Sequence, residues 1–301
     1  MIGIAGEPVM RCPSFAESAV IGNRAAPPEK QDLAHMQKRL FVGIIGLQDC
    51  TIDRNSMPKQ EAVRTLNVDR LRQACSRCSL QDLCLPVGVT AEDLELLDSM
   101  VETIGPLHGG DHLFHQGEPF LSLYAVRSGC IKSYIDTENG EEQVLGFHLP
   151  GELVGMDAIH RGSHQCSALA LDTAMVCRLP FDQLSEMTRR IPNLQKQFFR
   201  LMSRDLETSY SLSAHHSVDQ RLAAFLLGFG DRMRARGFSS THFILPMSRQ
   251  DIASYLRLAP ETVSRALSRF ASDSLIEISR RDIKVVDREK LEQNCPREFR
   301  L

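Results

Sequence analysis

The chain has 301 residues, of which 43% are apolar and 24% are charged, and its formal net charge is −3. This composition is typical of a folded globular protein and excludes a fibrous or wholly disordered chain. The longest apolar run, Leu40–Leu47, is far shorter than the roughly 20 residues that cross a bilayer, so we predict no membrane segment. Residues 1–30 lack a basic stretch followed by an apolar one. We therefore expect a cytoplasmic protein whose nine cysteines are not paired as disulfides.

Charge is unevenly distributed along the chain. Basic and acidic residues number 10 and 8 in residues 1–74, 11 and 20 in residues 75–222, and 14 and 10 in residues 223–301, which gives segment charges of +2, −9 and +4. A basic end on an acidic body is expected if only that end binds a polyanion, because its cations replace the counterions of the phosphates. A segment charge of +4 also arises by chance, so charge alone does not establish binding to a nucleic acid.

Residues 1–70 show no sustained apolar period, and prolines and asparagines interrupt their short apolar runs. We predict a weakly structured N-terminal extension there. Met36 and Met57 leave open a start of translation farther downstream. A short cysteine-containing loop follows at residues 71–90.

From about Leu107 to Pro180 the chain consists of short apolar segments separated by glycine and proline, which predicts an all-β sandwich or roll within a sensor domain at residues 91–187. Asn139-Gly140, between two strand-like runs, is the strongest hairpin signal in this region. The expected strands are His112–Phe114, Leu121–Val126, Ile131–Ile135, Gln143–His148, Leu169–Ala170 and Met175–Leu179.

A long helix is predicted within residues 188–220, because glycine and proline are absent after Pro192 and apolar residues recur at helical spacing. Two apolar stripes on this helix need two partners, the roll and a second subunit. Polar residues such as Asp205 interrupt the seam, so subunit association is expected to be tunable. Burial of the helix within one chain is the alternative. We expect the dimer interface to contain Phe198, Leu201, Met202 and Leu206.

Residues 247–270 predict two short helices joined by a tight turn, within a C-terminal domain at residues 221–301. Ser248 and Asp251 have the spacing of a capping box for the first helix, and the second helix opens at Pro260. The outer face of the second helix carries Glu261, Ser264 and Arg265. This arrangement is a helix-turn-helix, in which Arg can bind guanine, Glu can accept from cytosine and Ser can reach a phosphate or a base.

The flanking sequence argues against an ordinary helical hairpin, in which these polar side chains would only be solvated. Leu275–Ile278 and Ile283–Val286 predict a β-hairpin, or wing, with two arginines at its tip. We therefore predict binding to double-stranded DNA, with backbone contacts from Ser248, Arg280 and Arg281. The sequence contains no nucleophile–base pair, phosphate-binding loop or dinucleotide fingerprint, so we predict no catalytic residues and no enzyme, including an iron–sulfur enzyme.

Three cysteines, Cys75, Cys78 and Cys84, are spaced C-x2-C-x5-C just before the β region, and Cys130 begins a strand. Three clustered thiols and a distant one predict a four-thiolate site for structural zinc or an iron–sulfur cluster. The spacing favours a cluster, because zinc sites more often show two matched pairs. The other cysteines stand alone and receive no predicted role.

From Cys75 to Val286 the chain resembles the fumarate and nitrate reduction (FNR) regulators of the cyclic-AMP receptor protein superfamily. The matching segments are Cys75-x2-Cys78-x5-Cys84-Leu-Pro, Ser128-Gly-Cys-Ile-Lys-Ser133, Gly146-Phe-His-Leu149, Gly151-Glu-Leu-Val-Gly-Met-Asp-Ala-Ile159, Arg221-Leu-Ala-Ala-Phe225 and Glu261-Thr-Val-Ser-Arg265. The resemblance implies an α+β fold: a β-roll sensor domain like the cyclic-nucleotide-binding jelly roll, a long dimerisation helix and a C-terminal winged helix-turn-helix.

The resemblance also implies a function. Cys75, Cys78, Cys84 and Cys130 would bind a [4Fe-4S] cluster that assembles without oxygen and stabilises a homodimer. Glu261, Ser264 and Arg265 match the triplet that reads a TTGAT half-site in an inverted repeat. The protein would then be an oxygen-responsive activator that works with RNA polymerase at promoters of anaerobic metabolism genes.

Some features depart from the family or leave an alternative. His164-Gln-Cys-Ser lacks the arginine that grips the phosphate of a cyclic nucleotide, so a cyclic-AMP sensor is disfavoured. Arg257 stands where these regulators have glycine, and Ala259 stands where they have a Ser or Thr cap, and each change is expected to weaken the DNA-binding domain by about 1 kcal/mol. The alternative is a regulator of the same fold whose sensor binds zinc, or no cluster, and responds to another effector.

Overall fold

The computed structural model describes residues 75–213 and 216–295. Contacts divide the chain into Met1–Val63 and Arg64–Leu301, and only the second unit contains described residues. The predicted extension at residues 1–70 therefore lies outside them. In the described part, no helix is both long and apolar enough to cross a membrane.

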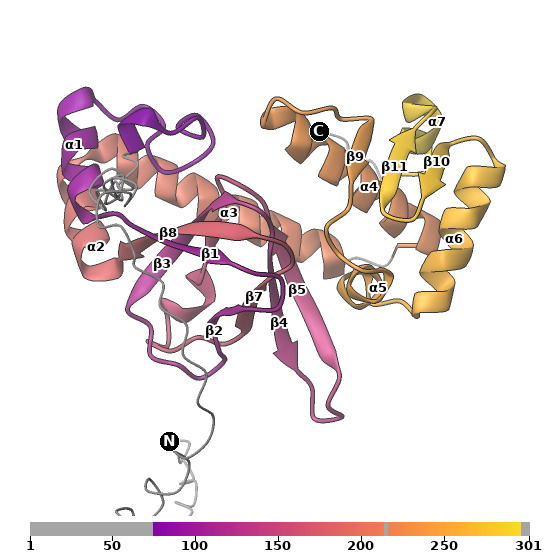
Figure 1. Ribbon diagram of the computed structural model, residues 1–301, viewed down its shortest axis with the longest axis horizontal. Helices are drawn as coiled ribbons and strands as arrows, with labels where there is room; N and C mark the ends of the chain where they lie inside the picture. Colours follow the sequence, from indigo (N-terminus) through magenta and orange to yellow (C-terminus); the bar gives the residue numbers. More distant parts are fainter. Residues whose placement is uncertain (1–74, 214–215, 296–301) are drawn as a thin grey trace, which may run out of the picture. The chain divides into compact units, whose positions relative to one another are not determined.

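The first part of the described chain is a roll of two antiparallel four-stranded sheets, with orders β1-β8-β3-β6 and β2-β7-β4-β5 (Figure 1). Buried side chains such as Phe114, Ile131 and Val176 fill the space between them. The predicted roll is confirmed, although the first and sixth strands were not expected. The strands are β1 (Glu102–Leu107), β2 (His112–Phe114), β3 (Ser122–Ser128), β4 (Ile131–Asp136), β5 (Glu142–His148), β6 (Leu153–Val154), β7 (Ser167–Ala170) and β8 (Ala174–Pro180).

The predicted hairpin at Asn139-Gly140 joins β4 to β5. Gly140 has φ +77°, a left-handed conformation that costs glycine little. Its N–H donates to the carbonyl of Thr137 over 2.9 Å, and the N–H of Thr137 donates to the carbonyl of Glu141 over 2.9 Å. Strand β5 is the last strand of its sheet and lies next to β4.

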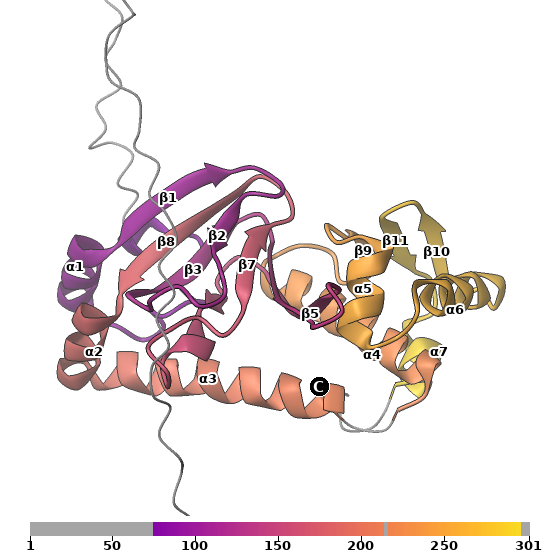
Figure 2. The same ribbon diagram turned by 90° about the horizontal axis from the view of Figure 1, so that it is seen from below.

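Three helices cover the β1-β8-β3-β6 sheet (Figure 2). They are α1 (Ala91–Met100), α2 (Phe181–Arg190) and α3 (Pro192–Ser213). Leu97, Leu184 and Leu194, one from each helix, are fully buried in a cluster with Leu123 and Leu179 of the sheet. This cluster attaches the long helix to the roll.

The predicted helix at residues 188–220 is in fact interrupted. Helix α3 ends at Ser213, and α4 (Val218–Ala235) begins after Ser217. Ser217 accepts a hydrogen bond from the N–H of Gln220, whose side chain accepts one from the N–H of Ser217. This capping box satisfies the free amides of a new helix start, which is why one helix becomes two.

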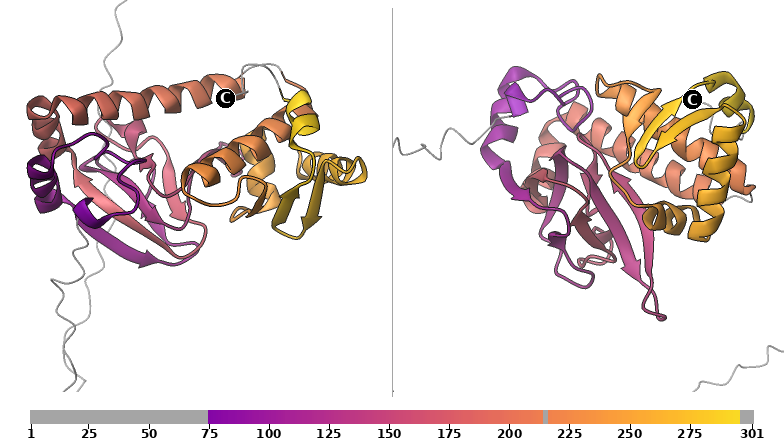
Figure 3. Two further views of the ribbon diagram at one scale, coloured as in Figure 1. Left: turned by 90° about the horizontal axis from the view of Figure 1, so that it is seen from above. Right: turned by 45° about the vertical axis from the view of Figure 1, so that its right-hand side comes forward.

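The C-terminal module (residues 216–295) contains the two short helices and the wing that the sequence predicts, together with β9, which it did not (Figure 3). Buried Leu226, Ile252, Val263, Leu267 and Ile283 form its centre. Its elements after α4 are β9 (His242–Ile244), α5 (Arg249–Leu256), α6 (Pro260–Ser272), β10 (Ile276–Ser279), β11 (Asp282–Val285) and α7 (Arg288–Gln293), with sheet order β10-β11-β9.

Candidate functional site

The cysteine loop folds through two turns. The 3-10 turn η2 (Cys75–Arg77) lets the N–H of Cys78 donate to the carbonyl of Cys75 over 3.1 Å. Farther on, the N–H of Cys84 donates to the carbonyl of Leu80 over 3.0 Å. These turns bring Cys75, Cys78 and Cys84 to the wall of one cavity.

The opposite wall of this cavity contains a fourth thiol, that of Cys177 on β8, beside Arg127 of β3. Side chains alternate between the two faces of a strand. Val176 is buried between the sheets, whereas Cys177 lies on the other face and packs against the cluster that includes α1 and α3. All described cysteines are free thiols.

Cys130, the predicted fourth ligand, is not brought to this cavity. Its side chain is 1% exposed and lies in the core shared by the roll and the C-terminal module, with Phe147 and Leu226. Its N–H donates to Asp172 over 2.8 Å. The thiol therefore packs against the module that follows α3, away from the cysteine loop. Cys177 instead lines this cavity with the three loop cysteines. The sequence analysis assigned it no role, because an isolated cysteine in a strand has no spacing signal.

Burial makes these thiols hard to ionise. It is the main cause that raises the pKa of Cys75 and of Cys84, the latter to about 12. Negative charge on Cys177 adds to the increase in both cases. Several thiolates in an apolar cavity repel one another, so they are stable together only around a cation that compensates their charge.

Four thiols are the donor set of structural zinc and of a [4Fe-4S] cluster alike. No three His, Cys, Asp or Glu side chains of the described chain converge on one metal position. The four thiols surround a cavity instead, and a [4Fe-4S] cluster is bound in that way by four cysteines. The cavity has a volume of about 30 Å³, which is the space of roughly one or two water molecules. The cavity as it stands is therefore too small for a larger group.

Side-chain amides tie the cysteine loop to helix α3. Gln197, which is buried, donates to the carbonyl of Cys84 over 3.2 Å. Asn193 donates to the carbonyl of Gly88 over 2.6 Å. At its other end the loop is held by α1, where Asp98 accepts from the N–H of Cys75. The cysteine loop is therefore hydrogen-bonded directly to α3.

The outer face of α3 differs from the predicted interface. Leu201 is 4% exposed and Phe198 is partly buried, and both pack against the chain's own core. Phe199 and Leu206 are 58% and 55% exposed, and Met202 is half-buried between them. The steps of three and four residues place Phe199, Met202 and Leu206 on one face, so the apolar face left for a partner is that one.

Helix α6 presents the predicted base-reading side chains to solvent. Glu261, Ser264 and Arg265 are all exposed, whereas Val263 and Leu267 are buried on the opposite side. The hydroxyl of Ser264 donates to the carbonyl of Pro260 over 2.9 Å, so its oxygen remains free to accept. Three polar groups with different hydrogen-bonding character therefore lie at the start of one exposed helix face.

A basic groove of about 560 Å³ runs beside them, between α5, α6 and the wing. Arg249, which the sequence analysis missed, has an Nη1 that is buried with no hydrogen-bond partner among the described residues, while its Nη2 donates to the carbonyl of Arg280 over 2.8 Å. Burial lowers the pKa of Arg249. A half-buried guanidinium with one unpaired nitrogen in a groove suits an anion such as a phosphate. The residues that line the groove include Ser248, Arg249, Ser264, Ser268, Arg280 and Arg281.

The three predicted backbone contacts have different environments. Arg280 and Arg281 are exposed at the wing, and Arg281 donates to the carbonyl of Pro246 over 3.1 Å. Ser248 is the N-cap of α5, and its hydroxyl donates to Asp251 over 2.6 Å and accepts from the N–H of that residue. The predicted capping box is confirmed, and it already uses the hydroxyl hydrogen of Ser248.

Known proteins resemble the chain over most of its length. Family models match residues 220–294 to the Crp-like helix-turn-helix domain and residues 106–190 to the cyclic nucleotide-binding domain. The transcriptional activator protein anr of Pseudomonas aeruginosa is 44% identical over 227 residues, which cover 74% of this chain and 93% of that protein. The fumarate and nitrate reduction regulatory protein of Escherichia coli is 39% identical over 240 residues, which cover 79% and 96%. The solved structure of FixK2 from Bradyrhizobium japonicum aligns with a TM-score of 0.58 at 25% identity and covers 65% of this chain and 96% of that one.

The turn between α5 and α6 contains a strained residue that can be tested. Arg257 has φ +54°, so an L side chain is held in the left-handed region there. Replacing it by glycine removes that strain, and we expect Arg257→Gly to stabilise the C-terminal module by about 1 kcal/mol. The measurement is the midpoint of urea unfolding. Arg257→Ala keeps the strain and serves as the control, and an equal midpoint for the two variants would contradict this account.

Proposed function

Since the chain belongs to the Crp/Fnr family of DNA-binding transcription regulators, we propose that it is an oxygen-responsive member that binds a [4Fe-4S] cluster and reads an FNR-type inverted repeat as a homodimer. Like its relatives, the chain is a transcription regulator and not an enzyme. The observation that carries the proposal is the gathering of Cys75, Cys78, Cys84 and Cys177 around one cavity.

DNA recognition is assigned to the exposed face of α6. Arg265 can donate two hydrogen bonds to guanine, Glu261 can accept from a cytosine amino group, and Ser264 has an oxygen free to accept. Arg249, Arg280 and Arg281 in and beside the basic groove supply positive charge for the flanking phosphates. Base contacts and backbone contacts therefore come from one continuous surface.

Oxygen sensing is assigned to the four thiols of the cavity. When bound, an iron–sulfur cluster would supply a positively charged iron–sulfide core that compensates the charge of the thiolates and that oxygen can oxidise. The thiols themselves define how far the cysteine loop lies from β8, because three belong to the loop and Cys177 belongs to the strand. This assignment replaces Cys130 by Cys177.

Signal transfer to the dimer is assigned to helix α3. Gln197 and Asn193 on α3 donate to carbonyls of the loop. One and two turns along, the same helix presents the apolar face of Phe199, Met202 and Leu206. A change in the position of the loop therefore shifts the population in which this face is correctly oriented for a second copy.

Activation at a promoter further implies contact with RNA polymerase in the cytoplasm.

The thiol assignment is tested by a matched pair of serine variants. We expect Cys177→Ser, prepared without oxygen, to fall from about four iron atoms per chain to nearly none and to lose the visible absorption of the cluster. Cys130→Ser is the control and keeps both. Iron loss only in the Cys130 variant would restore the original ligand set, and colourless wild-type protein with one zinc would refute oxygen sensing by a cluster.

The dimer face is tested by placing a charge on it. Phe199→Glu buries a carboxylate in the proposed interface, so we expect the dimer dissociation constant to rise by at least about tenfold. Sedimentation of the anaerobic protein measures this constant. Leu121→Glu, at a position that is 68% exposed on the roll, is the control and leaves it unchanged. Equal effects of the two variants would exclude this face of α3 as the interface.

The reading register is tested at Arg265. Arg265→Ala removes a bidentate contact, and we expect a loss of about 1–3 kcal/mol that is confined to one base pair of each half-site. A binding-site selection measures the preference. Arg280→Ala is the comparison. Loss of a phosphate contact weakens binding to all DNA sequences equally, and it lowers the number of ions released on binding by about one. An unchanged base preference in Arg265→Ala would show that another residue reads that position.

A further inference from the structure

The C-terminal module is docked on the roll of its own chain through contacts that the proposed function does not use. Val144, Phe147 and Leu149 of the roll belong to the same buried cluster as the centre of the module. The ring of Phe147 lies 5.2 Å from that of Tyr255 on α5 and 6.3 Å from that of Phe225 on α4. We call this contact region the joint. An apolar core of this kind resists sliding of the two parts, because interiors are closely packed.

At one side of the joint, α5 completes the hydrogen bonding of an edge strand. The N–H of Val144 on β5 donates to the hydroxyl of Ser254 over 2.8 Å, and that hydroxyl donates to the carbonyl of Glu142 over 2.7 Å. The side chain of Gln143 donates to the carbonyl of Ser254 over 2.6 Å. Unpaired groups of an edge strand need partners, so this pairing fixes α5 in register with β5.

Lys132 reinforces the same side. Its side chain is only 7% exposed, and its ammonium lies 2.5 Å from Glu142 on its own hairpin and 3.0 Å from Asp251 on α5. Asp251 is also the residue that caps α5 through Ser248. Lys132 thus connects the roll to the first turn of the helix that precedes α6.

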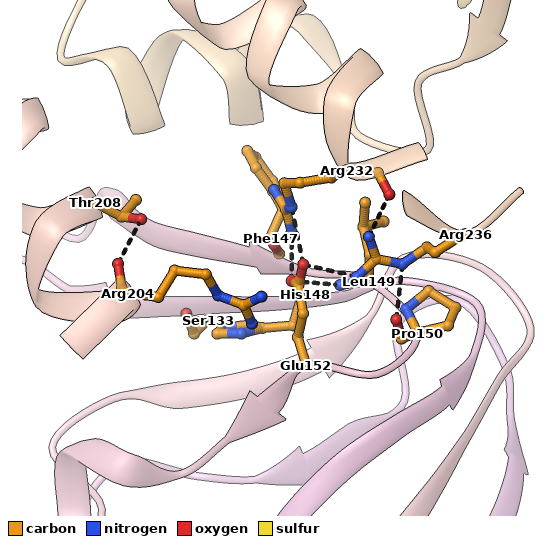
Figure 4. A network of polar contacts seen from close by, with 10 residues as sticks. All are labelled: Ser133, Phe147, His148, Leu149, Pro150, Glu152, Arg204, Thr208, Arg232 and Arg236. Carbon is orange, nitrogen blue, oxygen red and sulfur yellow. Dashed lines mark hydrogen bonds and ion pairs between the residues drawn. The ribbon is translucent and has the colours of Figure 1, made fainter. Parts of the chain in front are cut away.

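A buried carboxylate holds the other side of the joint (Figure 4). Glu152, in the turn between β5 and β6, accepts from Arg236 over 2.7 Å, from Arg232 over 2.5 Å and from the N–H of Leu149 over 3.0 Å. Arg236 also donates to the carbonyl of Pro150 over 2.7 Å. Burial on its own would raise the pKa of Glu152, but Arg232 of α4 and Arg236 just after it lower that pKa to about 2, so the carboxylate is charged.

We infer that Lys132 and Glu152 are positioning residues for DNA recognition, which set the spacing of the two half-sites by fixing the orientation of the C-terminal module on the roll. This inference rests on the proposed function, in which a dimer reads an inverted repeat. Both residues are buried in the joint, so they act through Asp251, Arg232 and Arg236 and not by touching DNA.

The physical argument is geometric. Adding one base pair between half-sites moves the second by about 3.4 Å and turns it by about 35° around the duplex axis. A module held on both sides of the joint cannot follow that change without breaking the contacts. With the joint loosened, these contacts no longer restrain each module, and it can follow.

The test measures spacing preference in the full-length, anaerobically prepared protein. Duplexes carry the same two half-sites with the spacer changed in steps of one base pair, and the affinity ratio between the best spacer and its neighbours is determined. We expect Lys132→Met to lower that ratio by about threefold to tenfold, because the ion pair that joins the roll to α5 is removed. Lys132→Arg restores it. Glu152→Gln is a second variant with the same expected direction.

Two controls separate a positioning role from a general loss of stability. Lys290→Met removes an exposed ion pair with Asp287 on the same module and leaves the ratio unchanged. The base preference within one half-site, which depends on Arg265, also stays unchanged in Lys132→Met. A uniform loss of affinity at all spacings in Lys132→Met, or an unaltered ratio, would overturn the inference while leaving the proposed function intact. Failure of the wild-type protein to bind any inverted repeat would instead overturn the proposed function, and this inference with it.

Discussion

The alternation of side chains along strand β8 between the inside and the outside of the roll is the constraint on which the proposed sensing site depends. Because Val176 is buried between the sheets, Cys177 has to lie on the outer face, where the cysteine loop and α1 cover the sheet. The apolar cluster on that face also contains Leu194 and Leu201 of α3. One apolar cluster therefore contains Cys75, Cys84 and Cys177 together with the helix that we assign to dimerisation.

Much of the fold could be predicted from local chemistry, and the failures have physical reasons. Turn residues such as Asn139-Gly140 marked the hairpins, since their backbone preferences act locally. Strand β6 was missed because its two residues, Leu153–Val154, are too few to show the alternation of apolar and polar side chains that marks a strand. The break after α3 lacks glycine and proline, yet Ser217 and Gln220 had capping-box spacing that could have revealed it. The two unusual residues of the helix-turn-helix, Arg257 in the left-handed region and the uncapped Ala259, were anticipated correctly.

The site was less predictable, because it depends on which face of a strand is covered. Cys130 and Cys177 are both single cysteines in or beside strands, and spacing alone does not say which one faces the cysteine loop. Tertiary packing decides: Cys130 is buried against the C-terminal module, and Cys177 lines the thiol cavity. Arg249 was overlooked for a similar reason, since only the approach of the wing to α5 encloses its guanidinium. In contrast, Glu261, Ser264 and Arg265 lie on one exposed face, because helical spacing alone determines that arrangement.

The most direct measurement of the central claim is an anomalous difference map at the iron absorption edge, from crystals of the full chain grown and kept without oxygen. The account predicts a compact iron peak between the cysteine loop and β8, within bonding distance of the sulfurs of Cys75, Cys78, Cys84 and Cys177. A peak bonded to Cys130, a single zinc ion in place of iron, or an iron-free cavity in protein that still binds its inverted repeat would contradict it.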